Sequence, residues 1–250
     1  MNYVDIPNIP KGKVTLAIVD GRINDSVEKG LFDNGINIIK TKAHPSLYDS
    51  VAFHPDMFLH HIGGSKIVYA PGTSIDIVRE LERYGFQMIR GETELKCKYP
   101  GNISYNAARV GRFVFHNTKY TDKVLKNFFL KLDLELVHIN QGYAKCAISV
   151  VDENSIITMD QGIARVADRK GLDVLVIEEK NILLPGLDYG FIGGSSGLID
   201  KDKWAVAGKL ESLESYSKIM EFVSNKGKKI ISLSGQQVVD IGSLIPVCSY

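Results

Sequence analysis

Short runs of β-branched and aromatic residues alternate along the chain with stretches whose apolar residues recur at helical spacing. The first run, Val14–Asp20 (VTLAIVD), predicts a strand, and the Asp-Gly pair at its end predicts a tight turn. Ser26–Asn34 then has the amphipathic spacing of a short helix, and Ile36–Thr41 (INIIKT) predicts a second strand. The local unit is therefore a strand, a helix and a second strand.

This unit recurs four more times, so an internal repeat is the main feature of the sequence. The spacing between successive second strands, roughly 38 to 56 residues, falls close to the range of repeat architectures. The later copies of strand, helix and strand are predicted at Lys66–Ala70, Ser74–Tyr84 and Phe86–Arg90; at Phe113–Asn117, Thr121–Lys131 and Glu135–Ile139; at Ser155–Asp160, Gln161–Lys170 and Asp173–Ile177; and at Lys203–Ala207, Ser212–Ser224 and Lys229–Leu233.

Residues at the helix ends support these boundaries. Ser74 and Thr121 stand where a side-chain oxygen accepts hydrogen bonds from the free N–H groups of the first turn. Glycine follows four of the five helices, at the position where a positive φ ends a helix. The second helix carries a predicted buried stripe of Ile75, Val78, Leu81 and Tyr84.

A third segment, which mixes apolar residues with Gly, Asn, Asp and Ser, follows each second strand. An open stack of such units needs polar end repeats, which the sequence lacks, whereas radial closure removes the exposed edges. We therefore expect a five-bladed α/β-propeller of ββαβ repeats with pseudo-fivefold symmetry; the alternative is a doubly wound parallel sheet. The third segments are predicted as inner strands at Tyr48–Asp56, Tyr99–Asn106, Tyr143–Val151, Leu187–Ile199 and Ile241–Val247.

The whole chain, 1–250, is predicted to be one domain with repeats at approximately 12–56, 57–106, 107–151, 152–199 and 200–250. Its 250 residues are 44% hydrophobic and 24% charged, which is typical of a globular domain with a sizeable core. The 30 basic and 29 acidic side chains give a formal net charge of +1. Without a concentrated basic face, neither nucleic acid nor a membrane is expected as a partner.

The N-terminal sequence lacks the regions of a signal peptide, and no apolar run reaches the roughly 18 residues of a membrane span. The three cysteines, Cys97, Cys146 and Cys248, are too few and odd in number for a disulfide framework. We therefore expect a cytoplasmic protein in which each cysteine is, by default, a small buried hydrophobic residue.

Five short segments of the predicted inner strands carry a further pattern. They read DSVAFHPD at Asp49–Asp56, PGNI at Pro100–Ile103, YAKCAISVVD at Tyr143–Asp152, GGSSGLI at Gly193–Ile199 and GSLIPVC at Gly242–Cys248. Together with the five ββαβ units, they resemble the pentein superfamily of guanidino-group-modifying enzymes. That superfamily includes arginine deiminases, dimethylarginine dimethylaminohydrolases and amidinotransferases, and a ribosome-binding initiation factor shares the propeller without catalysis.

The resemblance implies substrate-binding roles for several inner residues. Asp49 and Asp56 match superfamily carboxylates that receive a guanidinium or ammonium group, and a carboxylate suits a planar cation with paired N–H donors. The alternative is that both are solvated turn carboxylates at a strand end. The same resemblance places four more residues in the substrate site, namely Asn102, Tyr143, Ser195 and Ser243.

The resemblance also implies a catalytic arrangement that this sequence only partly retains. In the superfamily a cysteine thiolate attacks the guanidinium carbon, a histidine moves the proton and a carboxylate holds the charge. Cys248 lies about two residues beyond the position of that nucleophile, and Tyr99 stands at the position of the acid. The position of the histidine holds Tyr143, or Gly142 if the register differs by one residue. The candidate proton shuttle is therefore one of His54, His60 and His61.

Two function hypotheses follow. The first is a pentein-type protein that binds a small polar molecule, such as a guanidino or amino compound, in a central cavity without this catalysis. The second is a Cys248-dependent hydrolase or amidinotransferase that acts on a guanidino substrate. No cofactor or metal is expected, because His60 and His61 are neighbours on a strand and face opposite sides; the alternative is a metal site that also uses the nearby His54 and Asp56. Gly193–Gly197 lacks a phosphate-loop lysine and is interpreted as a closely packed inner strand.

Overall fold

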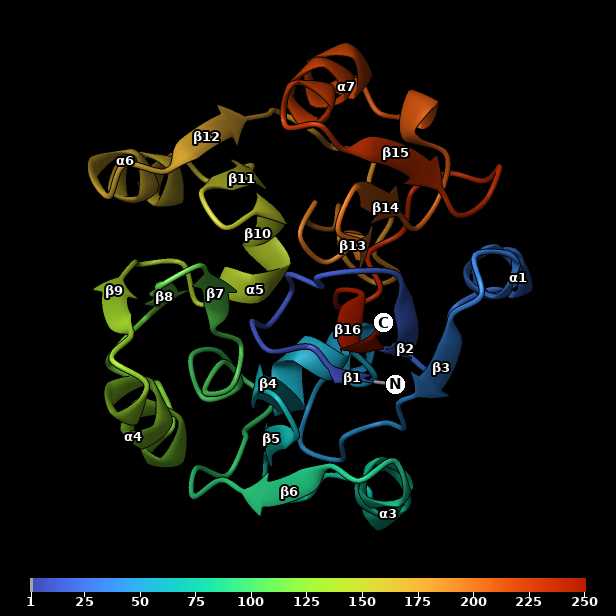
Figure 1. The fold of residues 1–250 in the computed structure, drawn as a ribbon. Helices are drawn as coiled ribbons and strands as arrows, with labels where there is room; N and C mark the ends of the chain where they lie inside the picture. The colour runs from blue at the N-terminus through green and yellow to red at the C-terminus, as the bar shows by residue number, and fades with distance from the viewer. Residues whose placement is uncertain (1) are drawn as a thin grey trace.

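Five small sheets surround a central axis in the computed structural model, which describes residues 2–250 (Figure 1). In each sheet the middle strand runs antiparallel to an inner strand and parallel to an outer one. From the inner to the outer strand, four sheets are β4 (Leu59–Gly63), β5 (Lys66–Tyr69) and β6 (Gln87–Arg90); β7 (Ala108–Val110), β8 (Phe113–His116) and β9 (Glu135–His138); β10 (Ile148–Asp152), β11 (Ser155–Thr158) and β12 (Asp173–Val176); and β13 (Ser196–Asp200), β14 (Lys203–Val206) and β15 (Lys229–Ser232).

The fifth sheet joins strands from both ends of the described chain. Its order is β1 (Asn2–Tyr3), β16 (Ile245–Ser249), β2 (Val14–Val19) and β3 (Asn37–Lys40). Because β16 pairs antiparallel with both β1 and β2, it is the inner strand of this sheet and closes the ring. The expected radial closure is therefore confirmed, and a single doubly wound sheet is excluded.

A helix connects the middle strand to the outer strand in every unit, and these helices form the rim of the ring (Figure 1). None of the helices within residues 2–250 is long and apolar enough to cross a membrane. They are α1 (Asp25–Asp33), α3 (Ile75–Arg83), α4 (Lys123–Lys131), α6 (Gln161–Arg169) and α7 (Tyr216–Asn225), the last preceded by the 3-10 turn η2 (Leu210–Ser212).

The predicted glycine ends of four helices are confirmed. Positive φ values of 76°, 87°, 78° and 67° occur at Gly35, Gly85, Gly171 and Gly227. The predicted stripe of α3 is wrong at both of its ends, because Ile75 and Tyr84 are exposed. The helix instead packs along the face that carries Ile77, Val78 and Leu81.

The predicted hydroxyl caps are wrong. Ser74 precedes α3, but its side chain makes no capping hydrogen bond. Thr121 does not cap α4; its hydroxyl lies 2.6 Å from Nδ1 of the buried His116. The carboxylate of Asp122 caps this helix and accepts hydrogen bonds from two backbone N–H groups, as its negative charge is favoured at a helix N-terminus.

The inner strands begin later than predicted. The first part of each segment is a turn or a short helix, as in η1 (Asp49–Val51) and α2 (Pro55–Phe58) before β4 and α5 (Ala144–Ala147) before β10. Gly, Asn, Asp and Ser favour turns, whereas the apolar run that follows forms the strand. Each inner strand pairs with the middle strand of the next unit. The polar turns that precede the inner strands therefore lie together at one end of the ring axis.

Close approaches of backbone and side chains hold neighbouring sheets together. Trp204 on β14 is fully buried, and its Nε1 donates to Ser149 Oγ of the adjacent sheet at 3.0 Å. A Cβ on Gly197 would lie 2.6 Å from the carbonyl oxygen of Leu244. Glycine therefore allows β13 to pack tightly beside the segment that leads into β16, as the inner-strand interpretation of this glycine-rich segment requires.

Candidate functional site

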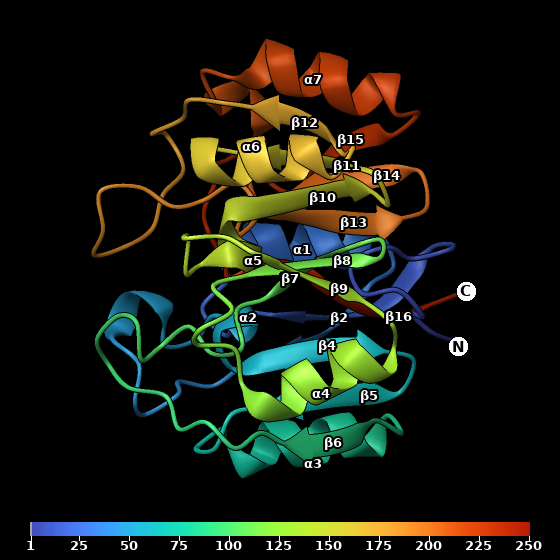
Figure 2. The ribbon, with the colours of Figure 1, turned by 90° about the vertical axis from the view of Figure 1, so that its left-hand side faces the viewer.

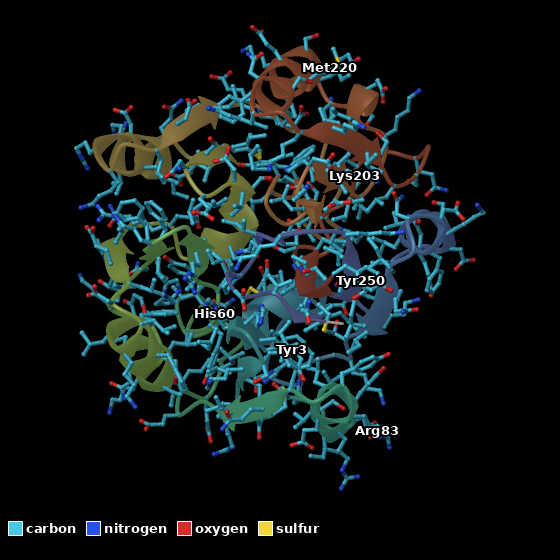
Figure 3. The ribbon with its side chains drawn as sticks, in the orientation of Figure 1. Tyr3, His60, Arg83, Lys203, Met220 and Tyr250 are labelled. Atoms are coloured by element: carbon cyan, nitrogen blue, oxygen red, sulfur yellow. The ribbon has the colours of Figure 1, made fainter. Side chains whose placement is uncertain are left out.

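Polar side chains from three separate segments meet at one end of the ring axis. His54 and Asp56 come from the turn into α2, Lys145 and Cys146 from α5, and Ser243 from the turn before β16. Figure 2 shows α2 and α5 at the end of the inner strands opposite to the two termini. All five side chains are buried. The cluster is therefore assembled by closure of the ring rather than by any one unit.

Local backbone geometry directs these side chains inward. Pro55 occupies the first position of α2 and fixes the turn that follows His54. Gly242 and Ser243 both have positive φ, at 61° and 75°. A Cβ on Gly242 would lie 2.3 Å from the Cβ of His54, so only glycine lets this turn pack directly against the histidine.

Asp56 is the centre of a hydrogen-bond network. Its Oδ2 accepts from Ser243 Oγ at 2.7 Å and from Cys146 Sγ at 3.1 Å. Lys145 Nζ donates to Ser243 Oγ at 3.0 Å, and Asn106 Nδ2 donates to Cys146 Sγ at 3.3 Å. Asp56 Oδ1 has no partner among the residues that the structure describes. One carboxylate oxygen thus orients its neighbours, and the other is available to a ligand.

His54 lies between two carboxylates without a hydrogen bond to either. Its Nε2 is 3.7 Å from Asp20 Oδ2, and its Nδ1 is 3.8 Å from Asp240 Oδ1. Both distances exceed those of hydrogen bonds, and within residues 2–250 neither ring nitrogen has a partner. Asp20 is already paired with Arg22 Nη2 at 2.9 Å. The imidazole is therefore free to engage a group that enters the site.

Asp240 is a buried carboxylate without a lysine or arginine partner among the described residues. The backbone N–H groups of Phe191 and Gly242 donate to its two oxygens at 2.8 and 2.9 Å. In the described part of the chain, no lysine or arginine nitrogen lies within 4.0 Å of them. Burial raises the pKa of the Asp240 carboxyl. A cation that binds beside it would favour the ionised form.

Burial also governs the ionisation of the two α5 side chains. It raises the pKa of the Cys146 thiol well above its usual value, and the nearby Asp56 and Asp240 raise it further. Burial lowers the pKa of Lys145, and the charge of Asp56 opposes that effect. The Cys146 thiol is consequently protonated at neutral pH, and only the thiolate form of a cysteine is nucleophilic.

A small pocket of about 50 Å³ opens onto this cluster. One water molecule needs about 10–15 Å³ in the same measure, so the pocket holds about three to five groups of that size. His54, Cys146 and Asp240 supply its polar part. Apolar walls around a few polar groups are typical of small-molecule sites, and the walls here are Tyr48, Val51, Tyr143, Leu184, Leu187, Tyr189 and Phe191.

Residues 18–245 match the model of one protein family, described as Family of unknown function (DUF6873). The chain belongs to this family. The match runs from β2 to the first residue of β16, so it includes every residue of the cluster around Asp56. No curated protein matches this DUF6873 sequence.

Solved structures share the fold over nearly the whole chain at low sequence identity. An inosamine-phosphate amidinotransferase of Streptomyces griseus matches with a TM-score of 0.60 and 10% identity, over 98% of this chain and 97% of that one. The amidinotransferase SxtG of Microseira wollei gives 0.58 and 12%, over 93% and 91%. A dimethylarginine dimethylaminohydrolase of Pseudomonas aeruginosa, complexed with citrulline, gives 0.54 and 11%, over 89% and 92%. This DUF6873 chain therefore has the five-fold pentein fold, which confirms the resemblance found in its sequence.

The structure brings five of the residues expected from the sequence to the pocket or beside it. His54 and Tyr143 line the pocket. Asp56 and Ser243 bond to each other next to Cys146. Asn102 Nδ2 donates to the hydroxyl of Tyr143 at 2.9 Å and so supports the pocket wall.

Three other candidates, which are described residues, lie outside the pocket lining. Asp49 is exposed in η1. Ser195 is buried, and its hydroxyl donates to a backbone carbonyl within its own turn at 3.1 Å. Cys248 is paired within the sheet between β1 and β2, and burial raises the pKa of its thiol to about 11.

The neighbouring histidines of β4 pack against aromatic rings. The ring of His60 lies 5.3 Å from that of Phe129, and the ring of His61 lies 6.3 Å from that of Phe86. Neither histidine is among the described residues that line the pocket, so of the three histidines considered from the sequence, His54 alone faces it.

Sequence reasoning did not select Cys146, Asp240, Asp20 or Asn106. Cys146 stands in an apolar stretch, where a single cysteine has a packing role by default. Asp20 and Asp240 each stand one or two residues before a glycine, which is typical of a turn. The available signal was the position of polar residues next to predicted strands, but only the closed ring shows that they converge.

Proposed function

We propose that the pocket binds a small organic cation of the guanidino or amino class. The observation that carries this proposal is Asp240, a buried carboxylate at the pocket that has no lysine or arginine partner among the described residues. Bringing a cation to it compensates a charge that burial disfavours, and N–H donors on a cation form strong hydrogen bonds to a carboxylate. Solved structures with this fold are named as amidinotransferases and as an enzyme complexed with citrulline, which agrees with this ligand class.

The size and lining of the pocket match the head of such a ligand. A guanidinium group has four heavy atoms, within the range of about three to five water-sized groups that about 50 Å³ holds. Tyr48, Tyr143 and Phe191 offer aromatic faces, which attract cations. The remainder of the ligand would lie beside Leu187 and Tyr189, two wall residues that are partly exposed to solvent.

Binding should depend on the charge of Asp240. We expect agmatine and arginine to bind the wild-type chain, and Asp240→Asn to weaken their binding by about tenfold to a hundredfold, because a hydrogen bond to a charged group contributes about 1.5–3 kcal/mol. Citrulline, whose side chain is uncharged, should bind weakly to both proteins. Calorimetric titration of each protein with each compound measures these differences.

Glu179→Gln is the matched control for this experiment. Glu179 is buried and accepts hydrogen bonds from the backbone N–H groups of Asn181 and Ser215, much as Asp240 accepts two such bonds, but it does not line this pocket. It should leave agmatine binding unchanged. Equal affinities of wild type and Asp240→Asn, or equal affinities for agmatine and citrulline, would refute the proposal.

A second candidate function, thiol-dependent cleavage of a C–N bond, is favoured by the position of Cys146. Its Sγ faces the pocket, and it lies within 4.8 Å of donor atoms of His54 and Asp56. A bound guanidinium would lower the pKa of the thiol. Sγ then bonds to the guanidinium carbon, and Asp56 or His54 takes the thiol proton and returns it to the departing amine. Water finally cleaves the C–S bond and regenerates the thiol.

Turnover should depend on Cys146 and not on the other two cysteines. We expect Cys146→Ser to lower release of ammonia or urea from agmatine, arginine or methylated arginines by about a thousandfold or more, as loss of a catalytic nucleophile does elsewhere. Serine can still donate to Asp56 and accept from Asn106, so the fold should persist. Cys97→Ser and Cys248→Ser are the controls and should retain turnover. If Cys146→Ser stays active, or Cys248→Ser alone loses activity while folded, this candidate is wrong; cation binding without any turnover supports the first function alone.

A further inference from the structure

The donor atoms of His54, Asp56 and Cys146 converge from α2 and α5 to within 4.8 Å of one another. Tetrahedral coordination with bonds of about 2.0–2.3 Å places ligand atoms about 3.3–3.8 Å apart. Cys146 Sγ and Asp56 Oδ2 are 3.1 Å apart already, so small side-chain adjustments suffice. We propose that these three residues bind a divalent transition-metal ion of the zinc type.

The strongest support is the set of donor atoms that lack hydrogen-bond partners. Both ring nitrogens of His54 and Oδ1 of Asp56 are buried without a partner among residues 2–250, and the two side chains are 1% and 2% exposed. A buried polar atom without a partner is costly, and such atoms are rare unless a ligand or ion completes them. Here three of them lie in one cluster beside a thiol.

Neighbouring groups already orient the proposed ligands. Ser243 Oγ donates to the carboxylate of Asp56, and Asn106 Nδ2 donates to the sulfur of Cys146. The two ring nitrogens of His54 lie 3.7 and 3.8 Å from Asp20 and Asp240. When one nitrogen binds a metal, the other can donate to a carboxylate, an arrangement that commonly fixes the tautomer and orientation of metal-binding histidines.

The donor set selects the class of ion. One imidazole nitrogen, one carboxylate oxygen and one sulfur suit zinc and similar transition metals, whereas magnesium and calcium prefer oxygen ligands alone. On binding, the metal–sulfur bond replaces the S–H bond of Cys146 and one proton is released to solvent. The ion's charge of +2 is then balanced by one thiolate and one carboxylate.

Three protein ligands leave a fourth position open, as in catalytic rather than structural zinc sites. His54 and Cys146 both line the pocket, so that position adjoins the cavity. An organic cation and the metal ion would therefore compete through charge repulsion. This departs from the expectation of no metal, which considered His60 and His61 with His54 and Asp56 nearby; here His54 and Asp56 meet Cys146, and His60 and His61 take no part.

The test uses the full chain, freed of metal by a chelator and titrated with Co²⁺ and Zn²⁺ without any organic ligand. We expect one Co²⁺ ion per chain, with a near-ultraviolet charge-transfer absorption that only a thiolate ligand gives, and its displacement by Zn²⁺. His54→Gln and Asp56→Asn should weaken binding by about a hundredfold or more, since loss of even an outer-shell partner costs about ten- to a hundredfold.

A second variant, in which Cys146 is the only cysteine, distinguishes loss of the thiolate ligand from loss of folding. Cys146→Ser should abolish the absorption, whereas the double variant Cys97→Ser/Cys248→Ser, in which Cys146 is the sole cysteine, should retain it. Absence of stoichiometric binding to wild type, absence of the absorption in the double variant, or its persistence in folded Cys146→Ser would each overturn the proposal. Agmatine titrations are separate, so failure here leaves the cation-binding function standing.

Discussion

Acidification should unfold this protein between about pH 6 and pH 4, because three buried histidines bind protons more weakly in the folded chain than in the unfolded chain. Burial lowers the pKa of His60 to about 3 and those of His61 and His116 to about 4. In the unfolded chain each titrates near its usual pKa of about 6.5. Each histidine therefore binds a proton more weakly when folded, so stability is complete above about pH 6.5 and falls as the pH approaches the folded pKa values.

The expected slope is steep. Each such histidine removes about 1.4 kcal/mol of stability per pH unit, so three together remove about 4 kcal/mol per unit, against a typical total of about 5–15 kcal/mol. Urea titrations from pH 7 to 4.5, followed by circular dichroism, measure it. His60→Gln should reduce the slope by about a quarter to a third, because burial lowers the pKa of His44 as well. His138→Gln, which alters an exposed histidine of β9, should leave it unchanged. A profile that is flat over this range, or one that His60→Gln does not change, would contradict the expectation.

Gly242→Ala should be among the most damaging single-methyl changes in the chain. Gly242 has a φ of 61°, and an added Cβ would lie 2.3–2.5 Å from three carbon atoms of His54. These atoms belong to the backbone and ring of a buried residue at the start of α2, so they have little freedom to move. The left-handed φ costs about 1 kcal/mol, and the overlap raises the total to about 3 kcal/mol or more.

Gly227→Ala separates the two causes. Gly227 has a similar φ of 67°, but no atom lies within 4 Å of the added Cβ. This variant should lose only about 1 kcal/mol in urea denaturation. Gly242→Ala should also lose agmatine and cobalt binding, because His54 is displaced, whereas Gly227→Ala should keep both. Equal losses of stability in the two variants would show that the contact with His54 is unimportant.

Local chemistry made the rim of the fold predictable and left the inner ends of the strands uncertain. A β-branched run such as Val14–Val19 and a helix-ending glycine such as Gly85 each act within a few residues, so sequence alone predicts them. The segment at Tyr48–Asp56 has the composition of a strand with polar positions, yet it forms η1 and the start of α2. Its conformation is decided by other units packed around the axis, which no local pattern contains.

The residues of the candidate site likewise include some that a local pattern predicts and some that only the folded ring brings together. Short segments that resemble the pentein superfamily led to Asp56, His54 and Ser243. Nothing local separates Cys146 from Cys248, since both are cysteines in apolar segments. Their difference is the neighbour that each thiol finds in space: Asp56 for Cys146, and the paired strands β1 and β2 for Cys248. That difference exists only after distant units have met.

Because β16 lies between β1 and β2, the pocket is complete only when the two ends of the described chain have joined in one sheet. Asp240 and Ser243 lie just before β16. The side chains that they meet, His54 beside Asp240 and Asp56 and Lys145 bonded to Ser243, belong to earlier units. A nascent chain that has emerged from the ribosome only as far as β15 has neither the strand that joins its ends nor two of the polar groups around the axis. Ligand affinity should therefore arise abruptly when the final strand inserts, rather than growing unit by unit.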